Sequence, residues 1–281
     1  MEYRELNNGI KMPCVGFGVF QIQDKDECVR VVKDAIEVGY RLIDTAQSYG
    51  NEEAVGEAIA KSSVPRADLF ITTKVWITNA GYEKAKASIE ESLMKMHLDY
   101  LDLVLIHQPL NDYYGTYKAL IELYKAGKIK AIGVSNFYPD RLVDLTLFNE
   151  IPPAINQIEV NPFHQQIDAQ KVNQKYHIQV EAWAPFAEGK NNIFTNQVLK
   201  DIGDKYGKTV GQVILRWLVQ KGIIPLAKTV RKERMIENIS IFDFELSKED
   251  MIKIESMDKK ESSFFEHQEA SSVERLAQLI R

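Results

Sequence analysis

Cysteine is scarce in this chain of 281 residues, which contains only Cys14 and Cys28. Two cysteines are too few for a disulfide framework, and no Cys/His spacing typical of a metal site occurs, so we expect no bound metal. A run of about 18 apolar residues, which a membrane helix needs, is also lacking. The first residues have no apolar segment typical of a signal peptide. These absences predict a cytoplasmic protein.

Basic residues are not in excess either: 35 Lys and Arg stand against 40 Asp and Glu, a net charge of −5. They cluster once, over residues 228–234, whereas a nucleic-acid surface needs a broader basic face. We expect neither nucleic acid nor membrane as a partner. No apolar stripe demands a protein partner, so we also expect a monomer. A 45% hydrophobic content is ordinary for a globular protein of this size.

Short apolar runs typical of buried strands recur along the chain, at 15–20, 41–45, 69–75, 101–107, 131–135, 155–160, 178–184 and 223–227. Amphipathic helical stretches lie between many of them, at 26–38, 52–61, 82–96, 116–125, 168–176 and 209–220. This alternation predicts an α/β fold with a parallel sheet covered by helices. Eight such units in one domain, residues 1–281, favour a closed (β/α)8 TIM barrel. An open doubly wound sheet is the alternative, but no Gly-x-Gly-x-x-Gly follows an early strand.

Three further segments have local signals. Asn7-Asn8-Gly9 between residues 3–6 and 10–13 predicts an N-terminal β-hairpin, because Asn and Gly tolerate positive φ. The polar segment 186–194 follows the seventh expected strand and is predicted to be a mobile loop. Ser247 and Asp250 resemble a capping box at the start of a helix.

Reactive side chains follow the ends of three successive expected strands. Asp44 and Tyr49 lie at and after the second, Lys74 lies near the end of the third, and His107 ends the fourth. In a barrel of this class the carboxyl ends of the strands carry the active site, so these four side chains are expected to converge.

Their chemistry suits protonation of an oxygen that gains negative charge. The Lys74 ammonium is expected to lower the pKa of Tyr49, and Asp44 to keep that lysine charged. His107 can donate a hydrogen bond to a carbonyl oxygen. Spacing alone leaves two alternatives open: structural caps and salt bridges, or a lyase in which Lys74 forms a Schiff base.

Several stretches resemble the aldo-keto reductase family, in the family's order and from about Glu5 to Phe265. They are residues 39–52, 73–76, 103–107, 133–137, 156–159 and 228–238. The resemblance, closest to bacterial aldehyde, 2,5-diketo-gluconate and methylglyoxal reductases, implies a TIM barrel plugged at the bottom by the hairpin. It also implies NADPH-dependent reduction of aldehydes and ketones to alcohols, with a hydride from nicotinamide C4. A relative that only binds NADPH is the alternative.

Carried over residue by residue, the resemblance implies a catalytic tetrad of Tyr49 as proton donor, Lys74, Asp44 and His107. The residues that it assigns to NADPH or NADP+ are Ser135, Asn136, Gln157, Trp183, Lys228, Thr229, Arg234, Glu237 and Asn238. The first three would hold the carboxamide, Trp183 would stack on the nicotinamide, and Lys228 with Arg234 would hold the 2′-phosphate.

The chain departs from the family at positions that concern the substrate. Phe20 and Gln108 stand where many members have Trp, and with Trp76 and His107 they are expected to line the substrate pocket. Ala227 replaces a common Pro, and Ala184 a common Ser. Because Gln108 makes the pocket more polar, we expect small oxygenated carbonyls as substrates.

Overall fold

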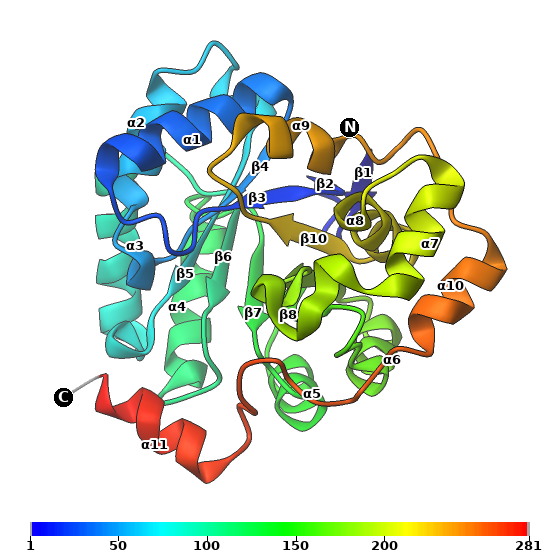
Figure 1. Ribbon diagram of the computed structural model, residues 1–281. Helices are drawn as coiled ribbons and strands as arrows, with labels where there is room; N and C mark the ends of the chain where they lie inside the picture. Colours follow the sequence, from blue (N-terminus) through cyan, green and yellow to red (C-terminus); the bar gives the residue numbers. More distant parts are fainter. Residues whose placement is uncertain (1, 280–281) are drawn as a thin grey trace.

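The computed structural model describes residues 2–279, and in this range eight parallel strands close into a barrel (Figure 1). Their order around the barrel is β10-β3-β4-β5-β6-β7-β8-β9. The strands are β3 (Gly16–Gly18), β4 (Leu42–Asp44), β5 (Phe70–Val75), β6 (Leu103–Ile106), β7 (Ile132–Ser135), β8 (Ile155–Glu159), β9 (Gln179–Trp183) and β10 (Ile224–Ala227). Each expected strand is present in a shorter form. Because the sheet closes on itself, the open-sheet alternative is wrong.

Helices surround the barrel, and several successive helices pack on one another, such as α1 on α2, α2 on α3 and α3 on α4, while α9 also contacts α1 (Figure 1). They are α1 (Lys25–Val38), α2 (Glu52–Ala60), α3 (Tyr82–Met96), α4 (Tyr113–Lys125), α5 (Pro139–Leu147), α6 (Ile167–Lys175), α7 (Gln197–Tyr206), α8 (Val210–Gln220), α9 (Lys232–Ile239), α10 (Lys248–Glu255) and α11 (Ala270–Gln278). All six expected helices are present. The helices α5, α7 and α9 were not predicted, although Pro139 at the first position of α5 is a known start signal.

Caps explain where some helices begin. The Asp112 carboxylate accepts from Gly115 N at 2.7 Å, so α4 starts three residues earlier than expected. Ser247 caps α10, but the reciprocal half of the expected capping box is absent from the described structure, since Ser247 N donates to the Tyr206 hydroxyl at 2.9 Å.

The N-terminal hairpin consists of β1 (Tyr3–Glu5) and β2 (Lys11–Pro13), which pair antiparallel as predicted. Leu6 and Met12 are buried against the lower interior of the barrel. We call this cluster the apolar floor; it comprises Leu6, Met12, Leu42, Phe70, Leu103, Leu105, Ala131, Ala154, Ile155, Ile224 and Leu226. The hairpin therefore plugs the end of the barrel where the strands begin, and leaves the other end to a site.

The segment after β9 is irregular. η4 (Ala187–Thr195) contains Glu188, Gly189, Asn191 and Asn192 with positive φ, so it is a tightly turned loop and not a regular helix. It contacts the C-terminal segment, because Lys190 Nζ donates to Ser263 O at 3.0 Å. Over the described range, no helix has the length and apolar character needed to cross a membrane.

Candidate active site

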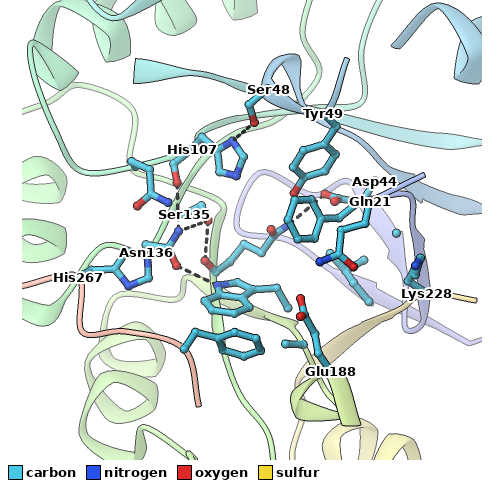
Figure 2. A pocket seen from close by; sticks show the side chains of 18 of the residues that line it. Gln21, Asp44, Ser48, Tyr49, His107, Ser135, Asn136, Glu188, Lys228 and His267 are labelled. Carbon is cyan, nitrogen blue, oxygen red and sulfur yellow. Dashed lines mark hydrogen bonds between the residues drawn. The ribbon is translucent and has the colours of Figure 1, made fainter. Parts of the chain in front are cut away.

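A cavity of about 620 Å³ opens at the carboxyl ends of the strands (Figure 2). We call it the main cavity. Most residues singled out in the sequence line it: Phe20, Asp44, Tyr49, Trp76, His107, Gln108, Ser135, Asn136, Gln157, Trp183 and Lys228. Lys74 lies beneath its wall and is fully buried. The rule that strand ends converge on one site therefore holds for this barrel.

Lys74 joins two of the other candidates directly. Its Nζ lies 2.5 Å from Asp44 Oδ1 and 3.2 Å from the Tyr49 hydroxyl, and it donates to Thr45 O at 2.9 Å. Asp44 is the last residue of β4, Lys74 is the fifth residue of β5, and Tyr49 ends the short helix η1 (Gln47–Tyr49). Two adjacent strands and the turn after the first thus bring a carboxylate, an ammonium and a phenol together.

The ammonium form of Lys74 is strongly favoured. Burial lowers the pKa of Lys74, but the charge of Asp44 and the hydrogen bonds to Asp44 and Tyr49 outweigh burial, so the pKa lies above its usual value. A Schiff base requires a neutral, accessible amine. The lyase alternative therefore has no support in this geometry.

The electrostatics of Tyr49 differ from the expectation. Burial raises the pKa of Tyr49, and the Lys74 charge opposes this without reversing it, so the pKa lies above and not below its ordinary value. The sequence revealed the cation but not the burial of the phenol. Tyr49 consequently keeps its proton at neutral pH, with a cation next to the oxygen that would become negative on giving it up.

His107 faces Tyr49 across the main cavity, with ring centroids 5.6 Å apart (Figure 2). Burial lowers the pKa of His107 well below its usual value, and the Lys74 charge adds to this. The imidazole is therefore neutral and carries one N–H. Ser48 Oγ lies 3.4 Å from its Nδ1 and contacts one edge of the ring.

The residues assigned to the nicotinamide form one hydrogen-bonded group. Asn136 Nδ2 donates to Ser135 Oγ at 3.1 Å, and Trp183 Nε1 donates to Asn136 Oδ1 at 2.9 Å. Gln157 Nε2 donates to Asp44 Oδ2 at 3.0 Å. Amide, hydroxyl and indole groups therefore line the same cavity as Tyr49, where they can bind a polar ring.

The residues assigned to the phosphate end lie around a second hollow. This basic cavity has a volume of about 210 Å³, and its lining includes Lys228, Thr229, Arg231, Arg234 and Asn238. Glu237 lines an adjoining hollow together with Arg234. Lys228 belongs to the walls of both the main and the basic cavity, which makes the two neighbours.

The cations of this region differ in how they are neutralised. Lys232 pairs with Asp34 and Glu37 at 3.1 and 2.8 Å. Among residues 2–279, the carboxylate oxygen nearest to the Arg234 guanidinium is that of Glu237, at 3.9 Å. Arg234 is therefore more available to an external anion than its neighbour Lys232.

The residues expected to contact the substrate surround Tyr49 and His107. Phe20 is 48% exposed and packs on Tyr49 with centroids 5.0 Å apart, and Trp76 packs on His107 at 5.0 Å. Gln108 Oε1 is buried and has no partner within residues 2–279. An orphaned acceptor in the cavity wall is suited to a hydroxyl of a ligand.

Several lining residues were missed: Gln21, Ser48, Glu188, Phe264, Phe265, His267 and Leu276. Ser48 could have been found, since it precedes Tyr49. The residues after 263 reach the site from the C-terminal segment, which carries no periodic signal that places it there. Glu181, buried beside Gln157, was also missed, although the alternation of polar and apolar residues over β9 was an available signal.

Comparison with known proteins identifies the family of the chain. Residues 14–259 match the model of the "Aldo/keto reductase family". The chain is 48% identical over 258 residues to the glyoxal reductase of Bacillus subtilis (strain 168), covering 92% of this chain and 93% of that protein. It is 41% identical over 261 residues to the methylglyoxal reductase DkgA of Escherichia coli (strain K12), covering 91% and 93%.

A crystal structure of a Bombyx mori aldo-keto reductase in complex with NADP superposes with a TM-score of 0.88 at 35% identity, covering 94% of this chain and 95% of that one. Family model, relatives and fold agree over nearly the whole length. The chain therefore belongs to the aldo/keto reductase family of oxidoreductases, which act on carbonyl groups.

Proposed function

We propose that this protein reduces small oxygenated aldehydes and ketones with NADPH, and that Tyr49 is the proton donor. The observation that carries the proposal is the Asp44–Lys74–Tyr49 chain of hydrogen bonds, which ends at the main cavity. The glyoxal and methylglyoxal reductases among its relatives support the reaction and the small size of the substrate.

The residues present fit NADPH. Ser135, Asn136 and Gln157 offer donors and acceptors to a carboxamide, and Trp183 offers a flat face beside them. At the other end, Arg234 and Lys228 line a basic cavity whose chemistry suits a phosphate. When bound there, NADPH supplies a hydride to the carbonyl carbon.

The chain's own residues manage the oxygen of the carbonyl. His107, neutral and with one N–H, donates to that oxygen and orients it toward the Tyr49 hydroxyl. Tyr49 gives its proton to the oxygen as negative charge develops there. The Lys74 ammonium, 3.2 Å from the phenol oxygen, stabilises the tyrosinate that remains, and Asp44 keeps that ammonium in place.

The cavity walls favour substrates with a second oxygen. Phe20 and Trp76 place apolar rings against Tyr49 and His107, while the unpartnered Oε1 of Gln108 accepts from a substrate hydroxyl or hydrated aldehyde. A purely apolar substrate would leave this acceptor unsatisfied, which has a cost.

The test is Tyr49→Phe, assayed by NADPH oxidation with glyoxal, methylglyoxal and a panel of larger aldehydes. We expect turnover to fall by about 100- to 10,000-fold, as for loss of a general acid, while NADPH binding followed by fluorescence stays the same. Tyr176→Phe, a phenol outside both cavities, serves as the matched control. Wild-type turnover in Tyr49→Phe would refute the proposal.

We also propose that the protein works as a cytoplasmic monomer on small molecules. Both cysteines are free and buried, as suits a reducing compartment. Analytical ultracentrifugation at assay concentrations should give a single species of 32.2 kDa. A dimer would contradict the proposed monomer.

A further inference from the structure

Glu181 is a buried carboxyl group to which the proposed mechanism gives no role. It lies in the middle of β9, pairs in register with Gln157 of β8 and Ile224 of β10, and its exposed fraction is 0%. A glutamate is rarely buried to this extent without a partner or a function. Its surroundings therefore need an explanation.

Glu181 shares the amide of Gln157 with Asp44. Gln157 Nε2 donates to Glu181 Oε2 at 2.7 Å and to Asp44 Oδ2 at 3.0 Å. Both N–H groups of the amide are thereby used, and the carbonyl oxygen is the polar atom left for a ligand in the main cavity. Two carboxyl groups, from β4 and β9, thus fix how Gln157 is presented.

The same contacts connect Glu181 to the proposed acid. The path runs from Glu181 through Gln157 to Asp44, and from there through Lys74 to Tyr49. We call these five side chains the polar layer. Each link is a hydrogen bond of 3.2 Å or less, and four of the five residues are buried.

The charge of this layer depends on Glu181. One ammonium, that of Lys74, faces two carboxyl groups, so with Asp44 ionised the layer is neutral only while Glu181 holds a proton. Burial raises the pKa of Glu181 to about 8, and the Asp44 charge adds to this, whereas Gln157 and Lys74 oppose it. Glu181 Oε1 has no partner within residues 2–279, so a proton there breaks no existing bond.

The other neighbours of Glu181 leave this balance unchanged. On the other side of β9, β10 contributes the apolar Ile224 and Leu226, and its cation Lys228 lies past the strand end, in the cavity wall. The charge of Glu181 also acts on Tyr49, whose pKa it raises further. An ionised Glu181 would therefore make the phenol a weaker acid.

We propose that Glu181 is a positioning residue for the reaction: it holds the Gln157 amide, and by keeping or releasing its proton it sets the charge beneath Tyr49. The proposal rests on the proposed role of Tyr49. It implies that carbonyl reduction slows as Glu181 ionises, because the proton donor then becomes weaker.

Glu181→Gln and Glu181→Leu separate the two parts of this role. Glu181→Gln keeps size and an acceptor for Gln157 but cannot ionise. We expect turnover close to wild type near pH 7. In wild type turnover should decline near pH 8, and in Glu181→Gln this decline should begin at a higher pH.

Glu181→Leu removes the acceptor for the Gln157 amide. We therefore expect NADPH binding, measured by fluorescence titration, to weaken by about 3- to 10-fold, as for the loss of one hydrogen bond. Glu181→Gln should restore that binding.

Unfolding of the protein without cofactor provides a readout that does not depend on catalysis. Between about pH 4 and pH 8 folded wild type holds a proton on Glu181 that the unfolded chain, with a glutamate pKa of about 4.3, has released. The melting temperature of wild type relative to Glu181→Gln should therefore fall as pH rises through this window, and become constant above it.

The outcomes distinguish this proposal from the proposed function. If Tyr49→Phe is inactive but Glu181→Gln has the wild-type pH–rate profile and the wild-type pH dependence of melting, the role of Glu181 is refuted and that of Tyr49 stands. Retained turnover in Tyr49→Phe overturns the proposed function itself, and the melting comparison then still tests the protonation of Glu181. Glu52→Gln, which alters a buried carboxyl group bonded to Thr73, is the matched control and should leave the pH–rate profile unchanged.

Discussion

The two halves of the barrel interior differ in the kind of side chain that fills them: one half is apolar, and the other is charged and polar. The apolar floor, at the end where the strands begin, contains aliphatic side chains and Phe70 and is closed by the hairpin. The polar layer lies nearer the carboxyl ends of the strands and contains charged and amide side chains, of which Asp44, Lys74, Gln157 and Glu181 are buried. Leu42 and Asp44, two residues apart on β4, belong to different halves.

Because of this difference, the apolar floor contributes mainly to stability, and the polar layer contributes mainly to the chemistry of the site. Burying apolar groups stabilises the fold by about 25 cal/mol per Å², whereas burying an ion pair contributes little or is costly unless every partner is present. The floor should therefore tolerate changes without loss of chemistry, whereas removal of the Lys74 charge or the Tyr49 hydroxyl from the polar layer should abolish it. Four substitutions test this contrast.

Removal of Lys74 should have the largest effect. Lys74→Met leaves the Asp44 carboxylate buried without its cation, which we expect to cost about 3–5 kcal/mol in the free energy of unfolding and to abolish turnover. Urea unfolding measures the free energy of unfolding, and NADPH oxidation measures turnover. In the double variant Asp44→Asn/Lys74→Met much of the stability should return without activity. If Lys74→Met were as stable as wild type, the stability of the polar layer would not depend on pairing its buried charges, and the contrast with the apolar floor would be refuted.

A floor substitution should show the opposite pattern. Leu103 on β6 is fully buried, and Leu103→Ala is expected to lower the free energy of unfolding by about 2–5 kcal/mol, because a cavity replaces packed atoms. The kcat of the folded enzyme should stay near wild type. A large drop in kcat at full folding would show that floor and polar layer are coupled.

Arg234 tests the periphery of the site. Arg234→Ala should weaken NADPH binding by about 10- to 100-fold, as expected for loss of a charge-assisted contact worth about 1.5–3 kcal/mol, with little effect on NADH. Lys232→Ala is the matched control, because its charge is already paired with α1. Isothermal titration calorimetry measures the affinity for NADPH and for NADH. An equal loss of affinity for both nucleotides would argue against a contact between Arg234 and the 2′-phosphate.

The smallest effect is expected outside the barrel. Asp24 caps α1 by accepting from Glu27 N at 2.8 Å, so Asp24→Ala should cost about 1 kcal/mol of stability. Turnover and cofactor affinity should not change. Thermal unfolding detects the loss, and a change in kcat would mean that the outer ring influences the polar layer.

The sequence predicted the architecture because barrel strands alternate with helices at a regular spacing. It also predicted the convergence of Asp44, Tyr49 and His107, since each follows a strand end and the strand ends of a closed barrel meet. The C-terminal segment could not be placed in this way: His267 and Phe264 reach the cavity through a long irregular connection, whose path depends on tertiary contacts such as that of Lys190 with Ser263.

The electrostatics were harder to predict than the positions. The Lys74 charge can be predicted from the sequence. The degree of burial that raises the pKa of Tyr49 depends on side chains from many elements and cannot. Glu181 was overlooked for a related reason. An alternation of polar and apolar residues in β9 marks its inward face, but the strand was interpreted as a uniformly apolar run.

The doubly anchored amide of Gln157 offers a spectroscopic reporter. Its two amide hydrogens are directed at two different carboxyl groups, so their NMR resonances should be well dispersed and slow to exchange with water. In an electron-density map, the same two acceptors decide which atom is nitrogen, an assignment that density alone seldom permits. A single labelled glutamine could thus follow the ionisation of the barrel interior in solution.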